Sequence, residues 1–159
     1  MSIYMKFEGI NGAVTTKGFE KWIELLSFNF GLGRSIGTAA RGSTNREGAE
    51  PHFAEVTITK PFDVASVKLE EDAWGGHLDS KVTFKFTTTT KDSVTTFLAI
   101  DLEKAGVSGY QVSSADQGNP TESVSINYAK ITVTHTGVDA KGGGSPIKAG
   151  YNLETMTKV

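Results

Sequence analysis

Few side chains in this 159-residue chain have the types and spacing that catalysis or metal binding requires. The three histidines, His52, His77 and His135, are far apart in sequence, and no two have metal-ligand spacing. The chain has no cysteine, which excludes disulfides, thiol nucleophiles and cysteine-ligated metals. We therefore predict no catalytic, metal-binding or cofactor-binding residue.

Three glycine-containing segments have only a superficial likeness to catalytic or nucleotide-binding motifs. Segment 31–37 has one residue too many for a dinucleotide fingerprint, and no amphipathic helix follows it. Segment 142–146 lacks the lysine and hydroxyl residue of a phosphate-binding loop. In segment 106–110, tyrosine stands where a nucleophile elbow has its second glycine. We therefore expect that the protein is not an enzyme.

The charged residues also favour binding to protein over other ligands. Glu70, Glu71 and Asp72 are consecutive, so on a helix they point in different directions and are interpreted as a solvated acidic end. A net charge of -2 argues against nucleic-acid or anionic-membrane binding. The arginines of segment 31–50 are therefore predicted to pair with carboxylates of another subunit.

Alternating apolar and polar residues predict a chain built mainly of β-strands. One helix is predicted over residues 64–74, between Asp63 as its N-cap and Gly75. We expect a mainly β, single domain over residues 1–159, a small antiparallel β-barrel or rolled two-sheet domain with one short flanking α-helix. The predicted strands span residues 2–9, 20–30, 53–59, 81–89, 94–103, 106–114, 122–135 and 147–153.

Two of these strands carry details that a structure can check. In the strand over 20–30, Leu26, Phe28 and Phe30 are predicted to face the core, with Ser27 and Asn29 on the other side. In the strand over 122–135 the alternation changes parity near Ala129, which predicts a bulge there or burial of both faces.

Segment 31–50 is predicted to be an extended arm. It has no sustained periodicity, is rich in glycine and arginine, and could span ~65 Å if fully extended. A second glycine-rich segment precedes the predicted terminal strand. Few prolines protect the predicted sheet edges, so we expect the chain to pair with copies of itself. A repeated heterologous contact closes a ring, and a second one stacks rings.

Five segments, in order along the whole chain, resemble the haemolysin-coregulated proteins of type VI secretion systems. These segments are Ile3–Glu8, Trp22–Gly31, Glu55–Lys60 with the aspartate-led helix, Pro120–Lys130 and Gly144–Leu153. The resemblance implies a β-barrel with a flanking helix, without catalytic activity. It further implies a hexameric ring, and rings that stack into a tube inside a contractile sheath.

The resemblance also implies partners and a location. The partners would be the chain itself, the sheath, the spike and small effectors carried in the lumen, with no nucleic acid and no membrane insertion. The polar start of the chain lacks the apolar run of a signal peptide. We therefore expect a protein of the bacterial cytoplasm that is secreted by the type VI system without a cleaved signal peptide.

Strand alternation and the arm supply the candidate site residues. The lumen candidates are Ser27, Asn29, Thr83, Lys85 and Thr87. The candidates for contacts between subunits or rings are Arg34, Arg41, Arg46, Gly144 and Pro146. Two alternatives stay open: a phage-like tail tube subunit, and a monomeric β-barrel that binds a ligand.

Overall fold

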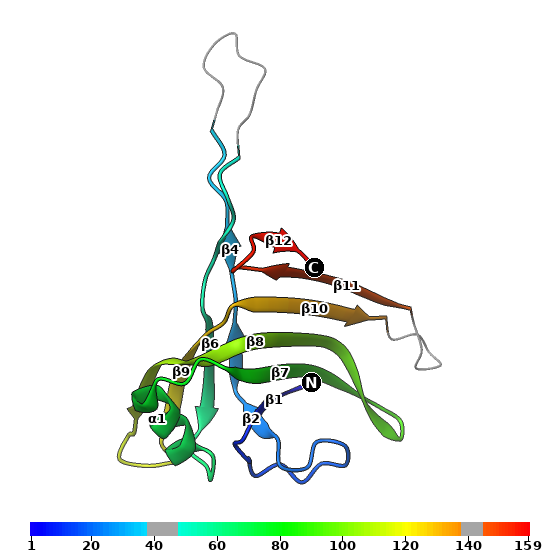
Figure 1. Cartoon of the computed structure of the whole chain (residues 1–159). Coiled ribbons are helices and arrows are strands. Elements are labelled where there is room, and N and C mark those ends of the chain that lie inside the picture. The colour runs from blue at the N-terminus through cyan, green and yellow to red at the C-terminus, as the bar shows by residue number, and fades with distance from the viewer. Residues whose placement is uncertain (38–47, 138–144) are drawn as a thin grey trace.

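The computed structural model describes residues 1–37, 48–137 and 145–159, which form two antiparallel sheets that share strand β8, a separate two-stranded ribbon and one helix (Figure 1). The prediction of a mainly β fold with one short helix is confirmed. The large sheet has the order β12-β11-β10-β8-β7-β1-β2. Its strands are β1 (Ser2–Phe7), β2 (Ile23–Leu25), β7 (Ser80–Thr90), β8 (Ser93–Ser113), β10 (Lys130–Thr136), β11 (Pro146–Asn152) and β12 (Thr157–Lys158).

The small sheet has four members in the order β3-β6-β9-β8. The second half of β8 pairs with β9, whereas its first half pairs with β7 and β10 in the large sheet. The strands of the small sheet run across those of the large one (Figure 1). Its other strands are β3 (Ser27–Asn29), β6 (Val56–Pro61) and β9 (Thr121–Asn127).

The chain passes between the two sheets at four places, one of them through the helix, and the sequence prediction was wrong about the other three. The predicted strand over 20–30 is broken between β2 and β3, and Leu26 at the break is 60% exposed instead of lying in the core. The predicted strand over 122–135 is β9 and β10, divided at Ala129. The parity change therefore marks a change of sheet. Conversely, the two strands predicted over 94–114 are one strand, β8.

The core lies between the sheets and follows the predicted alternation. Val82 and Phe84 of β7 are fully buried, and so are Val56 and Ile58 of β6. Phe28 of β3 packs edge-on against Phe84, with ring centroids 4.9 Å apart. Burial of these side chains supplies most of the favourable free energy of folding.

Helix α1 (Ser66–Gly75) begins two residues later than predicted and ends at Gly76, which has a left-handed φ of 71°. Leu69 faces the core, and Asp72 is also buried, where its carboxylate accepts a hydrogen bond from the Val107 amide at 2.9 Å. The interpretation of Asp72 as part of a solvated acidic end was therefore wrong. Trp74, in contrast, is 74% exposed.

A buried ionic cluster fastens α1 to the small sheet. The Lys60 ammonium lies 2.9 Å from the Glu122 carboxylate and 2.8 Å from that of Asp63, and Lys60 and Glu122 are fully buried. The Lys60 ammonium also donates to the Ser66 hydroxyl at 3.2 Å, and that hydroxyl donates to Glu122. The cluster therefore joins β6, β9 and the start of α1 through groups that are costly to leave unpaired.

Gly106 is required where β8 enters the small sheet. A Cβ at this position would lie 1.9 Å from the backbone oxygen of His77. We predict that Gly106→Ala lowers the free energy of unfolding by about 1–3 kcal/mol, because the segment after α1 must move away. Urea denaturation checks this, with Gly109→Ala as the control, since a Cβ there would meet only Ser125 at 3.5 Å. Equal stability of the two variants would contradict the prediction.

The described part of the predicted arm is a two-stranded ribbon. Strand β4 (Leu32–Gly33) pairs with β5 (His52–Phe53), and Ile36 forms a further bridge with Gly48. The ribbon rises away from both sheets (Figure 1). This arrangement agrees with an arm that reaches beyond the sheets.

Candidate functional site

The outer face of the small sheet carries an array of hydroxyl and amide side chains. Because the inward positions of its strands are taken by the core, the alternate residues face outward. Cross-strand pairing aligns them in two rows. The rows are Ser27–Thr59–Ser123–Gln111 and Asn29–Thr57–Ser125–Gly109.

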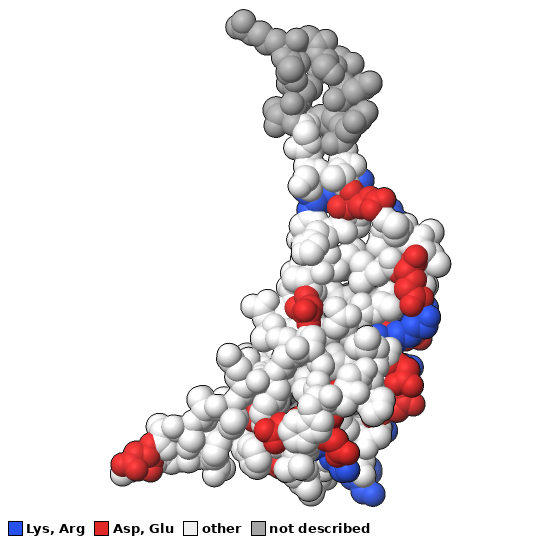
Figure 2. Space-filling view, turned by 60° about the vertical axis from the view of Figure 1, so that its left-hand side comes forward, with Lys and Arg blue, Asp and Glu red and all other residues white. Residues whose placement is uncertain are grey.

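None of these eight residues is charged. One carboxylate, that of Glu55, directly precedes β6 beside the second row, and it accepts a hydrogen bond from the Ser108 hydroxyl. In Figure 2 most charged side chains lie along one margin and near the lower end of the molecule, and the area beside them is largely uncharged apart from isolated acidic side chains. We call the eight residues of the two rows the hydroxyl face.

The hydroxyl face has the chemistry of a binding surface. The Ser27 and Thr59 hydroxyls lie 2.5 Å apart and hydrogen-bond to each other. The face offers donors and acceptors to a polar, uncharged partner surface, and it holds no base that would activate a nucleophile. Among residues 1–37, 48–137 and 145–159, no group of three histidine or carboxylate side chains could hold a metal ion.

The structure does not bring the two sets of lumen candidates together. Ser27 and Asn29 are exposed on the hydroxyl face. Thr83, Lys85 and Thr87 belong to β7 of the large sheet, the other layer of the fold.

The side chains of the three β7 candidates also make contacts within their own chain. Thr83 donates a hydrogen bond to Asp101 at 2.8 Å. The Lys85 ammonium lies 5.1 Å from the centroid of the Trp22 ring. Thr87 is 2% exposed and donates to a backbone oxygen at 3.1 Å.

The structure describes two of the five candidates for contacts between subunits or rings, Arg34 and Pro146. Arg34 is exposed at the base of the arm, where its Nε donates to the Ala49 oxygen at 2.6 Å. Pro146 is exposed at the start of β11 and pairs with Thr136 of β10. Arg41, Arg46 and Gly144 lie outside the described residues.

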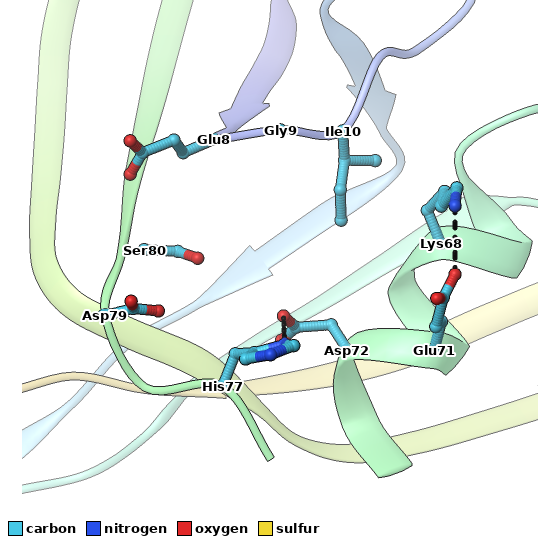
Figure 3. Close-up of a pocket in the computed structure, with 9 residues that line it drawn as sticks. All are labelled: Glu8, Gly9, Ile10, Lys68, Glu71, Asp72, His77, Asp79 and Ser80. Atoms are coloured by element: carbon cyan, nitrogen blue, oxygen red, sulfur yellow. Dashed lines mark hydrogen bonds and ion pairs between the residues drawn. The ribbon is translucent and has the colours of Figure 1, made fainter. Parts of the chain in front are cut away.

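A hollow between α1 and the end of β1 is lined by several carboxylates but has no catalytic arrangement among the residues that line it (Figure 3). Lys68 pairs with Glu71 at 3.1 Å, away from His77. The His77 Nδ1 lies 3.9 Å from the buried carboxylate of Asp72, and the imidazole is largely exposed. Glu8 accepts a hydrogen bond from a backbone amide at 2.8 Å. We therefore interpret this hollow as a solvated margin of the helix.

Two tyrosines beside the small sheet stay protonated at neutral pH. Burial, with a further contribution from Glu55, raises the pKa of Tyr128 to about 12, and its hydroxyl donates to the Ala54 oxygen at 2.7 Å. Burial and the nearby Glu122 carboxylate raise the pKa of Tyr110 as well. Neither phenol is available as a base.

Sequence reasoning found two residues of the hydroxyl face and missed the rest. The sequence does contain a pattern that indicates the other residues: hydroxyl side chains occupy alternate positions in segments 57–59 and 121–125. Only the strand register shows that these two segments are neighbours of Ser27 and Asn29.

Comparison with known proteins gives one consistent result. A family model described as "Type VI secretion system effector, Hcp" matches residues 4–135. A solved structure described as a type six secretion system protein is 28% identical and superposes with a TM-score of 0.91, covering 99% of each chain. No curated protein matches the chain.

More distant solved structures share the fold. Hcp1 from Salmonella typhimurium is 17% identical, with a TM-score of 0.75 over 99% of this chain and 98% of that one. A type VI secretion system effector from Yersinia pestis is 18% identical, with a TM-score of 0.73 over 94% and 98% of the two chains. In the described part of the chain, α1 is too short and too polar to cross a membrane.

Proposed function

Because the chain belongs to the Hcp family of type VI secretion system proteins, we propose that it forms hexameric rings that stack into the inner tube of that system. Sheath contraction expels the tube, and small effectors travel in its lumen. The protein acts as a structural subunit without catalytic activity, and its partners are its own copies, the sheath, the spike and the effectors. It is made in the bacterial cytoplasm and secreted by the same system. Family membership favours this function over a phage-like tail tube.

The hydroxyl face is the observation that carries the proposal. It lies on a four-stranded sheet whose outer strands, β3 and the second half of β8, have no further strand partner within the described residues. Six such sheets side by side make a wall of about 24 strands, and at a spacing of ~4.8 Å the wall closes to a bore ~37 Å across. With the large sheets on the outside, such a wall would place all six hydroxyl faces inward.

A wet, uncharged wall suits transport of varied cargo. Hydroxyl and amide groups keep the bore hydrated, and the absence of fixed charge prevents strong binding of oppositely charged proteins. We therefore place Ser27 and Asn29 in the lumen. Thr83, Lys85 and Thr87 line the lumen only if the large sheet faces inward, so tryptophan substitutions in the two sets distinguish the orientations.

Native mass spectrometry of the purified protein tests the ring. We expect a species with six times the mass of the 17.0 kDa chain, in equilibrium with the monomer at low concentration. A monomer that persists at every concentration would refute the proposal and favour a monomeric ligand-binding module.

The arm is proposed to join stacked rings through Arg34, Arg41 and Arg46, and the segment with Gly144 and Pro146 is a further candidate. We predict that deletion of residues 37–48 leaves the fold and the ring intact but prevents stacking, because the arm lies outside the core. Electron microscopy checks for tubes, and an unchanged melting temperature is the control. Tubes of normal length from the deletion variant would rule out this role.

A further inference from the structure

We propose that Trp74 anchors the contact between neighbouring subunits of the ring, by packing its indole against the β3 side of the next copy. The inference rests on the proposed ring and adds to it the surface that closes the ring.

Trp74 is the largest exposed apolar side chain on α1. It lies at the end of the helix and borders a hollow whose other walls include Ala73, Gly109 and Tyr110. One side of this hollow is therefore the helix, and the other is the second half of β8. An exposed tryptophan beside such a hollow is typical of a contact surface that is covered in the assembled protein.

The helix covers the β8 edge at only one end. The Val107 amide, next to Gly106 at the start of this part of the strand, already donates to Asp72 of α1. Further along, Val112 is 50% exposed, and β9 is the one strand that pairs with β8 there among the residues that the structure describes. The flank that a neighbour would meet therefore has two exposed apolar side chains, Trp74 at the hollow and Val112 further along β8, with Glu70 as the charged residue that also lines the hollow.

The opposite flank of the small sheet also carries an exposed apolar side chain. Leu26, directly before β3, is 60% exposed, and its backbone amide donates to the Thr59 oxygen of β6 at 2.8 Å. A second copy is the partner that covers both flanks, because a heterologous contact repeated around a ring brings the β8 flank of each chain to the β3 flank of the next.

Two matched substitutions test the energetic part of the proposal. We expect Trp74→Ala to raise the dissociation constant of the ring about tenfold or more, as loss of an aromatic anchor does. Val67→Ala is the control, because Val67 is also exposed on α1 but does not line the hollow, and we expect a change of less than about threefold. Native mass spectrometry over a dilution series measures both. Equal dissociation constants for Trp74→Ala and the wild type would overturn the proposal.

Tryptophan fluorescence tests the geometry directly. Trp22 is 9% exposed in the single chain, so the difference between the wild type and a Trp74→Phe variant reports on Trp74. In rings we expect acrylamide to quench this signal at least about threefold less than in monomers. Rings in which Trp74 is quenched as freely as in monomers would overturn the anchor and leave the proposed ring intact. A wild-type protein that forms no ring would overturn both.

Discussion

Replacing Glu122 by leucine is expected to lower the free energy of unfolding by about 3–5 kcal/mol, a large share of the stability of a domain of this size. The substitution leaves the Lys60 ammonium buried, with Asp63 as its remaining carboxylate partner. Urea denaturation followed by circular dichroism measures the loss. We expect Lys60→Met to have a comparable effect, since it leaves the Glu122 carboxylate uncompensated.

The double variant Lys60→Met, Glu122→Leu is the control. Removing both partners leaves no uncompensated charge at this pair, so we expect the double variant to be more stable than Glu122→Leu alone. If the two single losses simply add in the double variant, the pair is not coupled, and the description of the cluster is wrong.

Asn29→Trp is expected to weaken retention of a co-expressed small effector by about 10–100-fold while the rings persist. In the proposed ring the substitution places six indoles on the wall of the bore. An oversized side chain at the contact with the effector costs about 1–3 kcal/mol, which corresponds to a loss of affinity of roughly 10–100-fold. Quantitative co-purification of the effector measures the change, and native mass spectrometry confirms that the rings are present.

Lys85→Trp is the matched control for the orientation of the subunit. Lys85 belongs to the large sheet, so in the proposed orientation its replacement leaves effector retention unchanged. Release of the effector by Lys85→Trp but not by Asn29→Trp would show that the large sheet faces the bore.

The alternation of apolar residues predicted most of the strands, because side chains that alternate on a half-buried strand leave a period of two in the sequence. It did not predict the changes of sheet. A residue such as Leu26 has the apolar character of a core position, and only the pairing of β2 with β1 and of β3 with β6 shows that the chain turns outward there. Local pattern carries no information on which sheet a strand joins.

The sequence prediction also missed the polar residues of the core, because their burial depends on contacts between distant parts of the chain. Lys60 and Asp72 look like surface residues because each is charged, yet each is buried by a partner that is distant in sequence. Of the candidate site, Ser27 and Asn29 were found from their own strand. Thr57 and Ser125 complete the row with Asn29 only through the register of three strands.

A three-dimensional reconstruction of the purified protein by electron microscopy tests the central claim most directly. The proposed assembly predicts annular particles with six-fold symmetry, the small sheet on the inner wall and a bore about 37 Å across. Annuli with the large sheet on the inner wall, or single chains without any annulus at high concentration, would contradict it.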